Sequence, residues 1–568
     1  MSPVSQRRVR PGTLTALSGD CSYFPIPLSE QPLRSAMNNN KDILITIMLF
    51  LVVITGYNQF IALPRARAAQ AAAEEQLKAQ QQQQQAKSQA AQAVSLVEQV
   101  PPAATQPEVS YSLNLPQSDV TFSSKGAGIK TYLFKDNITD VDLTPYAGEG
   151  FFATLPQVDF EEKSRTATSI TFEGDLSPEV RVTKIFRFNP NGINQVEMTF
   201  ENKADTPLTI PSWGWNFGPG LATVKSEMSD NERESKAVYL IQEEGKKKPS
   251  LKVASTKSQP AGPWMWAGLE NRYFLSVLIP QNWKAGSLEP SQRNIGKQKR
   301  MWGFMGEKEI TGPRLQITTD AFTLAAGESR SFLSDFYFGP KDYKEFLKLP
   351  YHLDRSIEFG FFGALGKIAR NVLETFYGWT GNYGVAIIMM TILLQAILFK
   401  FTAMQFKSSA QMKKIQPEMK RLQEKYKGDP QALNREMFNL YRRYHVNPLA
   451  GCLPLLIQLP IFLALFNALR TSWSLHGAKF IWWITDLSSK DPYYILPILM
   501  GAVMFFQQKG NIPAGIDPAQ AAMFKYMPLI FTLLFMNFPS GLVLYWLTNS
   551  LLTFGIQTFI NKKMQNAN

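Results

Sequence analysis

The apolar residues of this 568-residue chain are gathered into a few long runs, most of which lie in the last third of the sequence. A run of about twenty apolar residues is long enough to cross a bilayer as a helix. One such run follows residue 42, and the others follow residue 382. The pattern therefore predicts a membrane protein with one span near the N-terminus and five more after a long soluble stretch.

The run at 448–469 differs from a plain membrane anchor. Asn447 and Pro448 are typical of a helix start. Gln458 lies near the middle of the run, and Pro460 removes one backbone hydrogen-bond donor. Because lipid offers no hydrogen-bond partners, such groups need partners inside protein or in a hydrated cavity. We therefore expect one face of this span to turn away from lipid.

Uncharged polar residues occur in nearly every expected core span, whereas acidic residues are absent from these spans. A single one is best explained by a hydrogen bond between helices, worth about 0.6 kcal/mol. Their recurrence favours a shared hydrated pocket. Proton-coupled transporters usually bury an acidic residue or a histidine, so the pattern disfavours that class. The residues are Thr391, Gln395, Gln458, Asn467, Asn537, Tyr545, Asn549, Ser550 and Gln557.

Residues 109–349 show short runs of alternating apolar and polar residues, separated by Gly, Pro and Asn. Asn191-Gly192 between two such runs is a strong hairpin signal. A stretch this long with little helical period predicts a large all-β sandwich. We expect its paired tryptophans to pack in the core rather than to form a binding surface: Trp213, Trp215, Trp264 and Trp266.

Residues 355–377 carry apolar side chains at helical spacing, with Lys367 and Arg370 between them. This pattern predicts an amphipathic helix on the membrane surface. The alternative is a helix that packs on the β domain.

Residues 403–446 repeat apolar side chains every three or four positions on both sides of Gly428-Asp429-Pro430. That tripeptide is typical of a helix end, a cap and a new helix start. The pattern predicts an antiparallel helical hairpin with a narrow apolar seam. Lys and Arg outnumber Asp and Glu in it, so the positive-inside rule places it in the cytoplasm. The β domain then lies outside, and both termini lie inside.

The N-terminal region adds an anchor and two segments without a packed core. Residues 43–63 form an apolar run that is long for a signal peptide, so we expect an uncleaved span; a cleaved signal peptide is the alternative, because Ala66-Arg67-Ala68 resembles a cleavage site. Residues 1–42 are polar and expected to be disordered, and Met37 is a candidate for the natural start. Residues 64–108, rich in Ala and Gln, are expected to be a linker.

Charge and chemistry narrow the class of function. Basic loops that flank the spans explain the net charge of +13 more simply than nucleic-acid binding, which we do not expect. The two cysteines do not have zinc-site spacing. The three histidines, His352, His445 and His476, lie in no nucleophile or metal motif. We therefore expect no catalytic residue, no metal and no cofactor, and the protein is predicted not to be an enzyme.

Three stretches of the last third resemble the YidC-type membrane protein insertases: NPLAGCLPLLIQLPIFLAL, DPYYILPILMG and FPSGLVLYW. Two stretches of the β domain, GLENRYFLSVLIP and FYFGP, resemble the Gram-negative form of that family. The resemblance runs from the first span to the C-terminus. It implies a multi-pass protein of the bacterial inner membrane that inserts integral membrane proteins and helps them fold, alone or with the Sec translocon. It also implies a hydrophilic groove, open to cytoplasm and lipid, that works without ATP hydrolysis.

The resemblance implies that the last five spans form this groove. We expect it to be lined by Thr391, Gln395, Gln458, Asn549, Tyr545 and Trp546, the last two by resemblance. The family typically carries a positive residue in the second span where this chain has Gln395, and Lys400 lies about 140° further around the helix. We therefore expect hydration and hydrogen bonding, rather than charge, to receive substrate tails.

The hairpin also offers candidate substrate contacts, and the hypothesis names the expected partners. Met412, Met419 and Met437 are candidate substrate contacts, because Met adapts its shape; a packed seam is an equal alternative. The expected partners are nascent integral membrane proteins, the Sec translocon, the ribosome and membrane lipids. Two other classes of function stay open, a secondary transporter of a small solute and a non-catalytic assembly scaffold, although the sequence has no visible inverted repeat to support the first.

The expected fold is an α-helical bundle of five core spans plus an N-terminal anchor span, with a large all-β periplasmic sandwich and a cytoplasmic helical hairpin. The expected boundaries are 1–42 for the disordered segment, 43–63 for the first span, 64–108 for the linker, 109–349 for the β-sandwich, 355–377 for the amphipathic helix, 383–401 for the second span, 403–446 for the hairpin, 448–469, 492–508, 524–538 and 540–560 for the third to sixth spans, and 561–568 for the tail.

Overall fold

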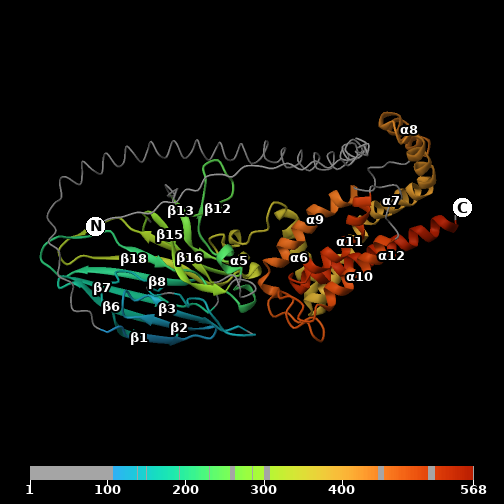
Figure 1. Ribbon diagram of the computed structural model, residues 1–568. Helices are drawn as coiled ribbons and strands as arrows, with labels where there is room; N and C mark the ends of the chain where they lie inside the picture. The colour runs from blue at the N-terminus through green and yellow to red at the C-terminus, as the bar shows by residue number, and fades with distance from the viewer. Residues whose placement is uncertain are drawn as a thin grey trace, which may run out of the picture. The chain divides into compact units, whose positions relative to one another are not determined.

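The computed structural model describes residues 107–568 except positions 137, 147, 149, 191, 229, 256–262, 285, 300–306, 445–452, 510–517 and 567–568. The expected N-terminal segment, first span and most of the linker therefore lie outside the described residues, as do Asn191, His445, Asn447, Pro448 and Cys452. Strands occupy the first half of the described chain and long helices the last third (Figure 1).

The strands form four antiparallel sheets. The largest has nine strands in the order β12-β11-β13-β14-β18-β8-β7-β6-β5; the others have the orders β1-β2-β3-β4, β10-β16-β15 and β17-β9. The bounds are β1 (Ser110–Asn114), β2 (Ser118–Ser123), β3 (Ile129–Phe134), β4 (Val141–Asp142), β5 (Glu161–Arg165), β6 (Ser169–Ser177), β7 (Val180–Arg187), β8 (Asn194–Asn202), β9 (Leu208–Ile210), β10 (Gly214–Phe217), β11 (Lys236–Ile241), β12 (Ser250–Val253), β13 (Trp264–Glu270), β14 (Phe274–Pro280), β15 (Leu288–Lys299), β16 (Glu307–Thr318), β17 (Phe322–Leu324) and β18 (Ser329–Pro340).

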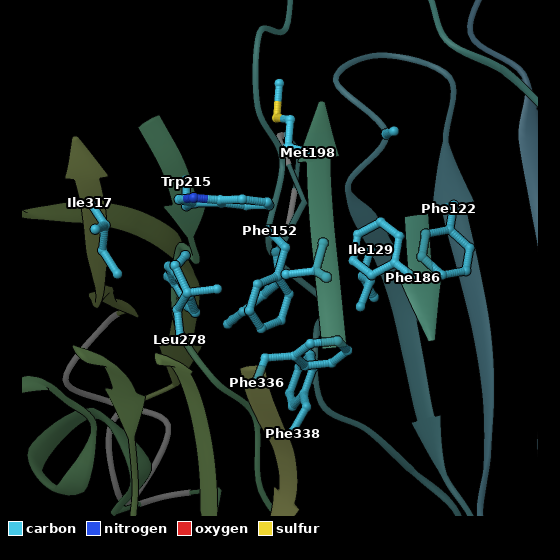
Figure 2. Close-up of a cluster of buried hydrophobic side chains, with 14 of the residues drawn as sticks. Phe122, Ile129, Phe152, Phe186, Met198, Trp215, Leu278, Ile317, Phe336 and Phe338 are labelled. Atoms are coloured by element: carbon cyan, nitrogen blue, oxygen red, sulfur yellow. The ribbon is translucent and has the colours of Figure 1, made fainter. Parts of the chain in front are cut away.

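One buried core joins three of these sheets. Phe122 of the four-stranded sheet packs on Phe186 of the nine-stranded sheet with ring centroids 4.9 Å apart (Figure 2). Trp215 and Ile317 add the three-stranded sheet to the same core. The sheets therefore pack face to face, and the β-rich domain predicted from the alternation is confirmed. Its paired tryptophans are all buried, as expected of core residues: Trp213, Trp215, Trp264 and Trp266.

The described helical elements are mostly later in the chain. Their bounds are η2 (Lys225–Glu227), α4 (Asn231–Glu234), α5 (Tyr343–Lys348), η3 (Leu353–Ser356), α6 (Gly363–Thr380), α7 (Tyr383–Lys425), α8 (Pro430–Arg443), α9 (Leu453–Arg470), η5 (Trp473–Leu475), α10 (Ile495–Lys509), α11 (Pro518–Phe535) and α12 (Ser540–Asn566).

Of the described helices, α7 alone is long and apolar enough to count as a membrane span by length and composition. Shorter apolar helical stretches occur at Gln458–Arg470, Ile495–Gln508 and Lys525–Phe535. The expected second span and the first arm of the expected hairpin form one continuous helix, because α7 runs for 43 residues. The Asn382 side chain caps its first turn by accepting from the Val385 N–H.

The second arm of the hairpin is α8, and its start follows the predicted chemistry. The Asp429 side chain accepts from the N–H groups of Gln431 and Ala432, and Pro430 occupies the first turn. Ile415 of α7 and Leu440 of α8 form the buried seam between the two arms.

Helix α6 has two distinct faces. Arg370 and Leu373 on one face are each 1% exposed, whereas Leu365 and Ile368 on the other are 45% and 59% exposed. The sequence places Arg370 between apolar positions, but the structure buries it against the ring of Tyr343, 5.3 Å away. One face of α6 therefore packs on protein, and the other exposes apolar side chains; its place on the membrane surface stays a prediction.

A fully buried lysine lies in the core of the β domain. Lys184 stands at an inward position of β7, with its Nζ 3.0 Å from the carbonyl oxygen of Gly126 and 2.6 Å from that of Phe152. A third bond of 3.1 Å reaches the Thr154 hydroxyl. None of these acceptors is a carboxylate, and burial lowers the pKa of Lys184 well below its usual value.

This burial makes a prediction about pH. In the unfolded chain the pKa of Lys184 returns to about 10.4. Between the two pKa values the unfolded state binds more protons, so the contribution of Lys184 to the free energy of unfolding rises with pH. The difference in unfolding free energy, wild type minus Lys184→Met, should therefore increase as the pH rises toward about 10, by at most about 1.4 kcal/mol per unit.

Urea unfolding of the full chain in detergent, followed by near-UV circular dichroism of the buried rings, measures this difference. Subtraction of the variant removes the contribution of groups common to both proteins, such as Tyr273, whose pKa burial raises to about 12. A difference that is constant from about pH 7 to pH 10 would contradict the prediction.

Candidate functional site

Two polar residues of the apolar half of α7 lie one turn apart and have different kinds of hydrogen-bond partner. Thr391 is fully buried, and its hydroxyl donates to the Ile387 carbonyl of its own helix at 2.7 Å. Gln395 is 6% exposed and reaches another helix. Thr391 is thus satisfied locally, whereas Gln395 joins two helices.

The partners of Gln395 are on α12. Its Nε2 donates to Asn549 Oδ1, and Thr553 Oγ1 lies 3.4 Å away. Gln395 Oε1 is buried and has no hydrogen-bond partner among the residues that the structure describes. A buried acceptor without a partner costs about 1–3 kcal/mol. The site therefore has one strong position at which a water molecule or an incoming donor gains a hydrogen bond.

A second polar pair joins α9 to α12. Gln458 Nε2 donates to the Tyr545 hydroxyl at 3.1 Å. Tyr545 is fully buried, while Gln458 is only half-buried. Both pairs share α12 as one partner, so four of the expected groove residues meet in two pairs: Gln395 with Asn549, and Gln458 with Tyr545.

Trp546 follows Tyr545 and faces aromatic rings instead. Its ring lies 4.8 Å from Phe462 of α9, and 5.9 Å and 5.1 Å from Phe531 and Phe535 of α11. Trp546 is half-buried. It therefore adds an apolar wall next to the two polar pairs.

The candidate methionines of the hairpin do not share one environment. Met412 and Met419 pack on the seam formed by Ile415 and Leu440. Met437 is half-buried. The apolar side chains that the hairpin region exposes most are Phe438, at 64%, and Met404, at 58%.

Sequence reasoning missed two features of this region. Thr553 is a partner of Gln395, and its spacing of four from Asn549 would have placed the two on one face. Arg370 is 1% exposed, and its three side-chain nitrogens have no hydrogen-bond partner among the described residues. No local pattern signals that burial, because it depends on contacts with Tyr343.

The polar groups of the two pairs are suited to hydrogen bonding. In the part of the chain that the structure describes, no group of three or more His, Cys, Asp or Glu side chains is placed to hold a metal. The polar pairs consist of amides and hydroxyls, which donate and accept hydrogen bonds but do not transfer protons near neutral pH.

Comparisons with known proteins identify the family of this chain. Two family descriptions match the chain: "YidC periplasmic domain" at residues 138–369 and "60Kd inner membrane protein" at residues 375–567. A membrane protein insertase YidC of Endomicrobium trichonymphae is 34% identical over 466 residues, which cover 80% of this chain and 86% of that protein. Another, from Geotalea daltonii, is 31% identical over 561 residues, which cover 92% and 99%.

A solved structure, described as an active YidC insertase with its first transmembrane domain resolved, covers 80% of this chain and 93% of its own. Its identity of 18% and TM-score of 0.35 carry no argument about the fold. The sequence relatives show the family, because they match at more than 30% identity over most of their length. This chain therefore belongs to the YidC family of membrane protein insertases.

Proposed function

We propose that this chain inserts integral membrane proteins through a hydrophilic groove bordered by α7, α9 and α12, and helps them fold, without ATP hydrolysis. The observation that carries the proposal is the buried, partly unsatisfied amide of Gln395 beside Asn549, with Gln458 and Tyr545 as a second polar pair. Polar groups are costly inside a membrane and are usually functional there.

The proposed topology has six spans. The first lies at 43–63, and the other five are formed by the apolar half of α7, by α9, α10 and α11, and by α12. The basic hairpin of α7 and α8 lies in the cytoplasm with both termini, by the positive-inside rule. The β domain lies in the periplasm, in agreement with the family description that matches it.

Free-energy magnitudes support insertion without a nucleotide. Each strongly apolar residue at the centre of a passenger span gains about 0.3–0.6 kcal/mol on entering the membrane. A charge at the bilayer centre costs about 2.5–3.5 kcal/mol. A span of about twenty residues therefore offsets the transfer of a short tail with few charges. The groove lowers the barrier by offering hydrogen bonds along the way.

The proposed groove receives passenger tails by hydrogen bonding rather than by charge. Gln395 is neutral, and its Oε1 accepts from a passing N–H or from water. Because it attracts no carboxylate by charge, the groove is expected to treat neutral and mildly charged tails alike.

The proposed partners follow from the exposed surfaces. Nascent membrane proteins and lipids meet the apolar helices. The basic hairpin, with Phe438 and Met404 exposed, presents a cytoplasmic surface for the ribosome, the Sec translocon or the passenger itself. Met437 would lend this surface flexibility, and Met412 and Met419 would contact a passenger beside the seam on which they pack.

Insertion by the purified protein tests the proposal. Full-length protein in liposomes should insert a single-span passenger with a short tail after nucleotide has been removed with apyrase. Protease protection of the tail measures insertion. If the tail is protected to the same extent in liposomes without the protein, insertion does not depend on the protein and the insertase proposal is refuted. A non-catalytic assembly scaffold would give this same result. Uptake of a small solute without passenger insertion would instead indicate a transporter.

Substitution of Gln395 tests the groove. In Gln395→Leu the bond to Asn549 and the acceptor for the passenger are lost, so we predict that the insertion rate falls about threefold to eighteenfold, which corresponds to roughly 0.6–1.7 kcal/mol per intramembrane hydrogen bond. Gln395→Arg also lacks the acceptor, but its guanidinium keeps donors toward Asn549 and keeps the groove hydrated, so this variant is predicted to be tolerated. The measurement is the initial rate of tail protection in proteoliposomes.

Thr548→Val is a matched control for loss of a polar group. The Thr548 hydroxyl donates to the Leu544 carbonyl of its own helix at 2.8 Å, so this variant should insert like the wild type. The melting temperature of each variant separates loss of function from loss of fold. Full activity of a well-folded Gln395→Leu protein would contradict the role of the polar pair.

A further inference from the structure

Trp482 has the most exposed large apolar side chain among the residues that the structure describes, at 89%. It lies in the segment 471–494, which joins the end of α9 to the start of α10. Its backbone φ of +42° is in the left-handed region, which is costly for a bulky residue. The chain therefore holds an indole ring outward at a local cost, with a ring contact only to the neighbouring Trp483 among the described residues.

The segment around Trp482 is well ordered by hydrogen bonds. The N–H of Phe480 donates to the Ile484 carbonyl at 3.0 Å, and that of Leu487 donates to the Ala478 carbonyl at 3.0 Å. Ile484 and Leu487 are buried in the helical core. The exposure of Trp482 is thus a consequence of the fold of this segment.

The neighbouring tryptophan shows the contrast. Trp483 is half-buried, packs on the helical core, and donates its indole N–H to the Asp491 carboxylate at 3.1 Å. No hydrogen bond within the described residues involves the indole N–H of Trp482. Two adjacent tryptophans therefore have different roles, one inward and structural, the other outward.

Other exposed side chains occur on this segment and at the ends of neighbouring helices. Ile481 is 44% exposed and Lys479 is exposed on the same segment. Tyr493, just before α10, is 67% exposed, and Trp379, at the end of α6, is 71% exposed. The set combines aromatic rings with a cationic head, which is the composition typical of a protein surface at the headgroup level of a bilayer.

We infer that the segment 479–482 is an anchor that inserts Trp482 and Ile481 into the headgroup region of the outer leaflet, with Lys479 beside the lipid phosphates. The inference rests on the proposed topology, in which α9 and α10 cross the membrane and their connection faces the periplasm. A boundary between water and acyl chains suits Trp482, because it contacts the apolar ring and leaves the N–H hydrated. The anchor fixes the depth of the outer ends of α9 and α10.

Fluorescence quenching by lipids tests the anchor. Trp482→Cys is made in the full chain after Cys21 and Cys452 are replaced by Ser, and is labelled with the fluorophore NBD in proteoliposomes. Spin-labelled phospholipids with the label near the headgroup should remove most of the emission, and those labelled deep in the acyl chain should remove less. Ala326→Cys, an exposed position in the turn between β17 and β18, should be insensitive to both.

Two results would overturn the anchor. Emission at residue 482 that aqueous iodide quenches but lipid labels do not would show that the segment lies in water. Emission insensitive to both would show that protein, such as a second copy of this chain, covers it.

The same vesicles report on insertion of the single-span passenger, so the two proposals are tested separately. Passenger insertion with no lipid quenching overturns the anchor alone. Lipid quenching without insertion supports the anchor and removes the insertase proposal.

As a further check, Trp482→Tyr should keep the depth of a label at residue 481, whereas Trp482→Ser should move that label toward water.

Discussion

The arrangement of the helical region depends on one constraint, which is that a polar atom in an apolar environment needs a hydrogen-bond partner within the protein. Gln395 and Gln458 lie on different helices, and both find their partners on α12, in Asn549 and Tyr545. These bonds fix which faces of α7 and α9 turn toward α12. The apolar packing of Trp546 against α9 and α11 then follows around them.

The parts of the fold that depend on local pattern could be predicted from the sequence. Alternation gives the strands of the β domain, and the caps at Asp429 and Pro430 give the start of α8. The same reasoning applies to the helical spacing of Ile415 and Leu440 at the hairpin seam. In each case the signal lies within a few residues of the feature it predicts.

Features that depend on distant residues could not be predicted in the same way. The partner of Gln395 is 154 positions away, and only the fold brings the two side chains together. Lys184 lies at an inward position of an alternating strand, but its acceptors come from turn and loop residues thirty or more positions earlier. The sequence shows that these polar groups are present, but it does not show which residues they contact. The burial of Arg370 against Tyr343 likewise depends on a contact between residues far apart in the chain.

Incomplete satisfaction is what distinguishes the proposed groove from an ordinary helix contact. If both amide atoms of Gln395 were bonded, α7 and α12 would form a closed and rigid pair with nothing to offer a passenger. In the proposed groove, a bond from water or a passenger N–H to Oε1 would be worth about 1–3 kcal/mol. That magnitude is large enough to favour entry and small enough to permit release.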